Sequence, residues 1–308
     1  MYKFVDLHCD TITTAYERKQ NFYKNNLHID INRLNQFKTP TQIFAIWLSK
    51  KYYKNAFEIT NKMIDFFEQQ IEENKNFIKK VTNFENIKTS SKINGLLSIE
   101  GGESIGNNID NIYHFFNRGV RILTLCWNYE NNIGFGAFTK STKGLKPFGK
   151  EVVKTMNDIN MVIDVSHLNE EGFWDLYKMA KKPFIATHSN AYTICNHYRN
   201  LKDEQLKAIK DCEGIVGINL CPKFLTNKNV ATEEHIFKHI DYIGDLIGYD
   251  KICLGGDFDG IEETPKNLED VSKYKNLFEK IEKIYGKDIL EKITYKNFYK
   301  FCEKNIKK

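Results

Sequence analysis

The amino-acid sequence predicts an α/β protein of the (β/α)8 TIM-barrel class, with residues 1–308 forming one domain. Eight short runs rich in Val, Ile, Leu and Phe alternate with amphipathic, charged segments, the pattern of parallel strands joined by helices. The runs are apolar almost throughout, as expected of strands buried on both faces. A length of 308 residues suits one such barrel. No GxGxxG motif follows a predicted strand, and this disfavours a dinucleotide-binding sheet.

The predicted elements follow the chain in a regular order with two interruptions. The strands are expected at Lys3–His8, Gln42–Leu48, Gly95–Ile99, Val120–Leu125, Met161–Val165, Phe184–Thr187, Gly214–Asn219 and Lys251–Gly255. Apolar residues at helical spacing predict helices near Tyr53–Asn74, Ile109–Arg118, Pro147–Asn160, Glu171–Lys181, Asp203–Asp211, Glu233–Ile247 and Tyr274–Tyr285. The interruptions are a long irregular connection from Ile12 to Pro40 and an extra segment, Phe77–Lys92.

Composition and charge limit the classes of partner. The net charge of +5 arises from lysines interspersed with acidic residues, which is typical of a solvated surface, so we expect no nucleic-acid partner. No apolar stretch is long enough to span a membrane, and Met1 leads almost directly into the first predicted strand, so we expect no membrane partner and no signal peptide. Seven scattered cysteines with no CxxC pair predict free thiols and a cytoplasmic location.

Polar residues able to bind a metal follow five of the predicted strands, where each strand ends. His8 and Asp10 end the first strand, and alternation of side chains predicts that they project together. The same position after later strands is taken by Glu100, His167, His188 and Asp257. Because barrel chemistry lies at the carboxyl ends of the strands, these residues are expected to converge on one rim.

The residue types predict metal-assisted hydrolysis of an amide-like bond. Five ligands (His8, Asp10, Glu100, His167 and His188) are too many for one catalytic zinc with an open position, but they suit two metals bridged by Glu100. Two ions about 3.5–4 Å apart hold a hydroxide between them and polarise a carbonyl. Asp257 could orient that hydroxide and pass a proton to the leaving amine.

Each of these residues also has an ordinary structural interpretation. A histidine at a strand end is often only hydrogen-bonded, and an aspartate there is often a helix N-cap. Arg199 is suited to grip a free carboxylate, although on its own it equally suits a surface salt bridge. His114, His235 and His239 fall in helix patterns and are expected on the surface.

Six motifs in order resemble the membrane dipeptidase (renal dipeptidase) family of zinc peptidases, which belongs to the amidohydrolase-like barrels. They are Asp-Leu-His-Cys-Asp-Thr (6–11), Ile-Glu-Gly-Gly (99–102), Asp-Val-Ser-His (164–167), Ala-Thr-His-Ser-Asn-Ala (186–191), Arg-Asn-Leu (199–201) and Gly-Gly-Asp-Phe-Asp-Gly (255–260). The resemblance runs from Phe4 to about Glu303 and is that of an unanchored, bacterial-type member.

The resemblance implies a binuclear zinc dipeptidase with two Zn²⁺ per chain. By family analogy His8 and Asp10 bind one zinc, His167 and His188 bind the other, and Glu100 bridges them. Arg199 would bind the dipeptide's C-terminal carboxylate, and Asp257 would serve in proton transfer and hold the substrate amine. Family members cleave dipeptides with broad tolerance, including some with a C-terminal D-residue, and many are homodimers, so a homodimer is expected here.

One departure from the family pattern bears on substrate binding. Trp127 occupies the place of a substrate-contacting histidine of the animal enzymes, and Asn128 is a candidate replacement donor. Two other functions stay open. One is a barrel amidohydrolase acting on a cyclic amide, lactone or N-acyl amino acid. The other is a non-catalytic metal- or peptide-binding barrel, which the presence of Asp257 beside all five ligands disfavours.

Overall fold

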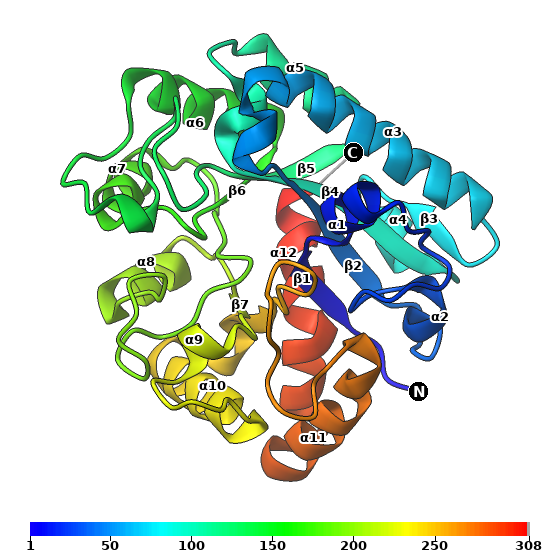
Figure 1. Ribbon diagram of the computed structural model, residues 1–308. Helices are drawn as coiled ribbons and strands as arrows, with labels where there is room; N and C mark the ends of the chain where they lie inside the picture. Colours follow the sequence, from blue (N-terminus) through cyan, green and yellow to red (C-terminus); the bar gives the residue numbers. More distant parts are fainter. Residues whose placement is uncertain (307–308) are drawn as a thin grey trace.

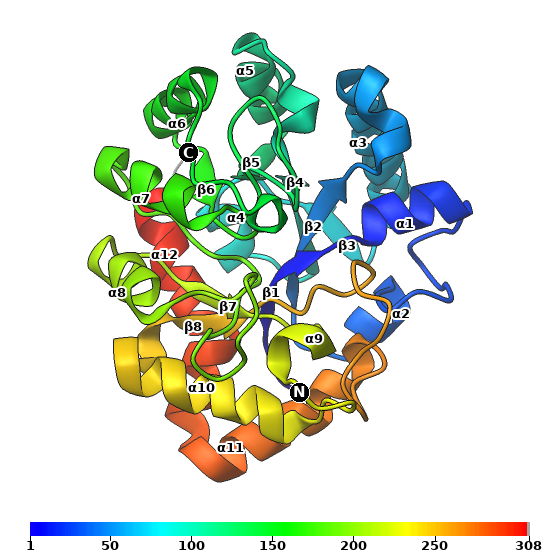
Figure 2. The ribbon, with the colours of Figure 1, turned by 60° about the vertical axis from the view of Figure 1, so that its left-hand side comes forward.

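The computed structural model describes residues 1–306 and contains a curled parallel sheet enclosed by helices (Figure 1). Its strands are β1 (Val5–Cys9), β2 (Thr41–Trp47), β3 (Ile78–Lys80), β4 (Ile93–Glu100), β5 (Val120–Thr124), β6 (Val162–Asp164), β7 (Val216–Ile218) and β8 (Ile252–Leu254). Neighbouring strands follow the order β6-β5-β4-β2-β1-β8-β7, and β3 pairs with the start of β4. From a second direction the strands are again surrounded by helices (Figure 2).

The open side of this sheet is closed by the segment predicted as the sixth strand. Ile185 forms a parallel bridge to Asp164 at the end of β6, and Ala186 forms one to Val216 in β7. Backbone hydrogen bonds continue on both sides, from Val165 N to Ile185 O and from Gly217 N to Ala186 O. The predicted (β/α)8 architecture is therefore confirmed, with Phe184–Thr187 contributing isolated bridges in place of a full strand.

Most predicted helices are present, and several short ones were missed. The helices are α1 (Thr11–Arg18), α2 (Ile31–Leu34), α3 (Ala56–Glu73), α4 (Phe84–Lys88), α5 (Asp110–Asn117), α6 (Pro147–Ile159), α7 (Glu170–Met179), α8 (Asp203–Asp211), α9 (Pro222–Leu225), α10 (Glu233–Ile247), α11 (Tyr274–Glu291) and α12 (Asn297–Asn305). The missed helices are α1, α2, α4, α9 and α12. Within residues 1–306 we find no helix whose length and apolar character would allow it to cross a membrane.

Two apolar clusters hold the barrel together. The larger one lies between the strands and the surrounding helices. The smaller one, called the inner cluster below, fills the barrel. It contains one or two residues from each strand or bridging segment of the barrel wall: Val5, Leu7, Ile43, Leu96, Ile122, Val162, Ile185, Ile215 and Cys253. Phe298, Phe301 and Cys302 of α12 complete this inner cluster, and α12 (red) lies behind the central strands in Figure 1. The barrel is therefore a packed core closed at one end by α12.

The structure corrects the expectation that His235 and His239 are surface residues. Both are buried, because they lie on the inner face of α10 with Ile236 and Ile240. The His239 ring accepts a hydrogen bond from Ala191 N at 3.1 Å and lies 3.1 Å from Leu225 O. Burial lowers the pKa of His239 to about 4, so this ring is a neutral hydrogen-bonding link between α10 and the loops at the rim.

Candidate active site

The first pair of candidate ligands is aimed into the barrel by an irregularity in β1. Val5 and Leu7 face the inner cluster, so strict alternation would turn His8 outwards. The pairing of β1 with β2 shifts register between Asp6 and Cys9, which is a β-bulge and re-aims the residues that follow. Asp6 supports this turn by accepting a hydrogen bond from His8 N at 3.0 Å. His8 and Asp10 consequently lie together, 3.4 Å apart between Nε2 and Oδ2.

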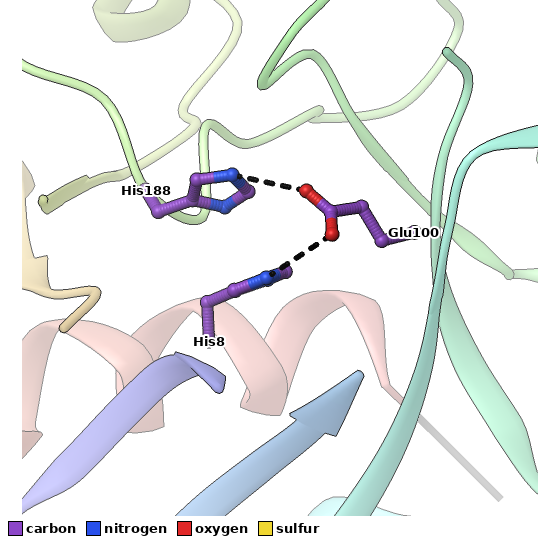
Figure 3. A group of neighbouring side chains, drawn as sticks. All are labelled: His8, Glu100 and His188. Atoms are coloured by element: carbon purple, nitrogen blue, oxygen red, sulfur yellow. Dashed lines mark ion pairs between the residues drawn. The ribbon is translucent and has the colours of Figure 1, made fainter. Parts of the chain in front are cut away.

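Glu100, the last residue of β4, lies between the two groups of candidate ligands. Its Oε2 is 3.7 Å from His8 Nε2, while its Oε1 is 2.8 Å from His167 Nε2 and 3.3 Å from His188 Nε2. Figure 3 shows one carboxylate oxygen directed at the ring of His8 and the other at the ring of His188. His167 adopts a left-handed backbone with φ of 69°, a conformation that is costly for a residue with a Cβ and is typical of functional sites.

Asp257 approaches the cluster of candidate ligands (His8, Asp10, Glu100, His167 and His188) from the loop after β8. Its Oδ1 lies 3.9 Å from His8 Nε2, and its Oδ2 accepts a hydrogen bond of 2.9 Å from the Asn219 side chain. Asp257 also has a left-handed backbone, with φ of 58°. Gly260 lies against both acids, since a Cβ built there would be 2.1 Å from Asp10 Oδ2 and 2.6 Å from Asp257 Oδ1. Glycine at this position therefore leaves room for both carboxylates.

The electrostatics of the cluster are those of a site crowded with negative charge. Burial, followed by the charge of Asp10, raises the pKa of Glu100 to about 8. Burial likewise raises the pKa of Asp257 to about 6. Burial lowers the pKa values of His167 and His188 far below the usual range. Burial also opposes protonation of His8, but Glu100 and Asp10 outweigh it and raise the His8 pKa well above its usual value.

The residues present fit divalent metal ions. Among residues 1–306, two sets of three ligand atoms lie within 4.8 Å of one another: His8 with Glu100 and His188, and His8 with Asp10 and Asp257. In the same part of the chain, Nε2 of His8 and Oδ1 of Asp10 are buried and have no hydrogen-bond partner. Nitrogen and carboxylate ligands of this kind are those that zinc prefers, and a cation would satisfy atoms that are otherwise costly to bury.

A cavity of about 530 Å³ opens over the cluster. Trp127 lines it and contacts Trp47 and Tyr129, with ring centroids 4.9 and 5.5 Å away. Asn128 also lines it, but its Oδ1 lies 2.7 Å from Nδ1 of His167. All the predicted site residues are thus brought to one end of the barrel, and the structure gives Asn128 a contact with a candidate ligand that the sequence did not indicate.

Arg199 lies beside the cluster and is only 4% exposed, so the surface salt bridge considered above is wrong. Its Nη2 donates to His188 O at 3.2 Å, while its Nε is buried and has no hydrogen-bond partner among the described residues. Within residues 1–306 no carboxylate lies close enough to form an ion pair with it. The guanidinium therefore has unused hydrogen-bonding capacity beside His188, and Arg199 lines a second pocket, of about 350 Å³, that it shares with His167.

Three supporting residues were missed by the sequence analysis. Asn219 holds Asp257, while Thr187 contacts the ring of His188 and donates to the buried Asp164. The signal for Thr187 and Asp164 was present, because both lie within motifs that end in or contain a candidate ligand. Asn219 ends the seventh predicted strand, a position like those of the candidate ligands, but its contact with Asp257 depends on how β7 and β8 pack side by side.

Comparison with known proteins identifies the family of the chain. The family model of the membrane dipeptidases, peptidase family M19, matches residues 1–307. The dipeptidase tcpJ of Claviceps purpurea (strain 20.1) is 31% identical over 290 residues, which cover 85% of this chain and 68% of that protein.

Two solved structures share the whole fold. The dipeptidase AC, a metallopeptidase of family M19, superposes with a TM-score of 0.92 at 25% identity, over 99% of this chain and 98% of that one. A metallopeptidase from Rhodobacter sphaeroides, solved with a phosphinate mimic of the dipeptide L-Ala-D-Ala, also gives a TM-score of 0.92, at 24% identity and 99% coverage of both chains.

Proposed function

This chain belongs to the membrane dipeptidase family and is a metal-dependent peptidase, and from that premise we propose that it hydrolyses dipeptides at a binuclear zinc centre. The observation that carries the proposal is the position of Glu100. One of its carboxylate oxygens faces His8, and the other faces His167 and His188. A carboxylate shared in this way between two groups of ligands suits a bridge between two ions.

The proposed ligands divide into two groups around Glu100. His8 and Asp10 would hold one zinc, and His167 and His188 would hold the other. Ions held by these residues would make bound water more acidic and would polarise the peptide carbonyl. Asp257 faces this position from the loop after β8, with its Oδ2 fixed by Asn219. Its Oδ1 would orient the attacking water and pass the proton of that water to the leaving amine.

Arg199 is the proposed anchor for the substrate's C-terminal carboxylate. Its guanidinium is buried next to His188, has an unpartnered Nε and forms no ion pair within residues 1–306. A free carboxylate could bind it bidentately, and this would place the scissile bond beside the metal ligands. The cavity of about 530 Å³ has room for a small peptide.

The test is the metal content of the purified chain together with hydrolysis of a panel of L,L- and L,D-dipeptides. The L,D-dipeptides are included because the related metallopeptidase from Rhodobacter sphaeroides was solved with a mimic of L-Ala-D-Ala. We expect about two zincs per chain and cleavage that a chelator abolishes and zinc restores. Failure to take up zinc would overturn the proposal. If the chain binds two zincs but hydrolyses only lactones or N-acyl amino acids, the proposed dipeptide substrate is wrong and one of those classes takes its place.

A further inference from the structure

Resting on the metal centre proposed above, we propose that Thr187 and Asn128 are positioning residues that hold two candidate ligands in one tautomer. Thr187 would fix His188 and Asn128 would fix His167, each by accepting the hydrogen on Nδ1. Both Nε2 lone pairs would then face Glu100. A neutral imidazole carries its hydrogen on only one of its nitrogens, so the partner of Nδ1 decides what Nε2 can bind.

The argument for His188 begins at Asp164, which is fully buried. Its Oδ1 accepts backbone hydrogen bonds of 2.9 Å from Ser166 and Thr187. Its Oδ2 accepts hydroxyl hydrogen bonds of 2.6 Å from Thr124 and Thr187. Four donors therefore converge on this carboxylate, and the single hydroxyl hydrogen of Thr187 is among them.

Because the Thr187 hydrogen is given to Asp164, the Thr187 oxygen can only accept from His188. The two atoms, Thr187 Oγ1 and His188 Nδ1, are 2.8 Å apart, which is a full hydrogen bond. The hydrogen between them therefore belongs to Nδ1, and the lone pair of the ring lies on Nε2. The Asp164 carboxylate, the Thr187 hydroxyl and the His188 imidazole are thus linked in series by hydrogen bonds. At the far side of the ring, His188 Nε2 lies 3.3 Å from Glu100 Oε1.

The argument for His167 is shorter. Its Nδ1 lies 2.7 Å from the side-chain oxygen of Asn128, and an amide oxygen can only accept. The lone pair of His167 is again left on Nε2, which is 2.9 Å from Nε2 of His188 and 2.8 Å from Glu100 Oε1. Three electron-rich atoms then face one another in a buried site, an arrangement that a divalent cation would stabilise.

This role for Asn128 differs from the substrate contact expected from the sequence. Asn128 follows Trp127 in a loop that lines the cavity, but its amide oxygen is directed at a ligand. Loss of such an outer hydrogen bond typically lowers metal affinity by about 10–100-fold, because the ring is no longer held in orientation and its basicity falls. The effect is exerted through His167, so Asn128 acts on the metal site and not on the substrate.

The first test reads the tautomer directly in the metal-free full chain. Long-range ¹H–¹⁵N NMR correlations of protein labelled at histidine distinguish hydrogen on Nδ1 from hydrogen on Nε2, and His167→Gln and His188→Gln variants assign the two rings. We expect the Nδ1–H form for both. The Nε2–H form in either ring overturns the proposal for its partner. Since no metal is present, this result stands even if the binuclear zinc centre proves wrong.

The second test compares variants that remove or keep the acceptor. Thr187→Val and Asn128→Leu keep the size of the side chain and lose the acceptor, whereas Thr187→Ser and Asn128→Asp retain one. Zinc affinity is measured by competition with a chelator. We expect losses of about 10–100-fold for the first pair and of less than about threefold for the second. Equal affinities within each matched pair would overturn the proposal, and should one variant fail to fold, the other pair decides.

Discussion

The clash predicted at Gly260 allows a sharp test of the active-site geometry. In Gly260→Ala the new Cβ would lie 2.1 Å from Asp10 Oδ2 and 2.6 Å from Asp257 Oδ1, whereas real Cβ contacts are almost never below 3.0 Å. The two carboxylates must therefore move by about 0.9 and 0.4 Å. Gly260 does not have a positive φ, so the added methyl group introduces no backbone strain of that kind. Its whole effect should be exerted on the two acids.

We expect this change to lower activity far more than stability. Overpacking in a core costs about 1–3 kcal/mol, and short carboxylates that can rotate place the effect at the low end. A displacement of about 1 Å at a reacting centre costs about 100-fold in rate, so kcat/KM for a dipeptide should fall by about that factor. Metal content should fall as well, because Asp10 is a proposed ligand.

The assay compares Gly260→Ala with Gly134→Ala, measuring kcat/KM, metal content and Tm. Gly134 is a matched control because a Cβ there would meet its nearest atoms at 3.5 Å or more, which is ordinary contact, and its φ is not positive. The control should behave as the wild type in all three measurements. A Gly260→Ala protein with wild-type kcat/KM and metal content would refute the placement of Asp10 and Asp257 around this loop.

Three further predictions concern single histidine and arginine side chains. His239 has a pKa of about 4 when folded and about 6.5 when unfolded, so its contribution of about 3 kcal/mol to the free energy of unfolding is present above pH 6.5 and is lost as the pH falls to 4. Urea unfolding at pH 6.5 and at pH 4 should therefore show a smaller decrease in the free energy of unfolding for His239→Gln than for the wild type, and equal decreases would contradict this. Arg199→Ala should raise KM for dipeptides by about 10–100-fold, and a similar change for C-terminally amidated substrates would exclude a carboxylate-binding role. His188→Ala should lose one zinc and most activity by metal analysis and kinetics, whereas two zincs with full activity would remove it from the ligands.

Much of the barrel could be predicted because each strand is a buried apolar run and each main helix has a regular apolar face. The predicted ranges Asp203–Asp211 and Glu233–Ile247 coincide with α8 and α10. The burial of His239 could have been found as well, because it is spaced with Ile236, Ile240 and Ile243 on one face of its helix. The assumption that histidine in a helix is exposed outweighed this pattern.

Other features depend on contacts between distant segments and could not be predicted. Alternation correctly placed His8 and Asp10 on one side, but the bulge that turns them inwards arises from the pairing of β1 with β2. The contact of Asn128 with His167 depends on the path of the loop after β5. The sixth predicted strand became two isolated bridges, because hydrogen bonding to its neighbours is limited to a few residues.

The closure of the barrel by α12 has a consequence for folding during synthesis. The inner cluster joins Val5 and Leu7 in the first strand to Phe298 and Phe301 in α12. A chain emerging from the ribosome can form its early strands and helices in order, but its interior stays incomplete until α12 has been released. Until α12 packs against them, the apolar side chains of the inner cluster lack part of their cover, and apolar surface of this kind is prone to aggregation during folding.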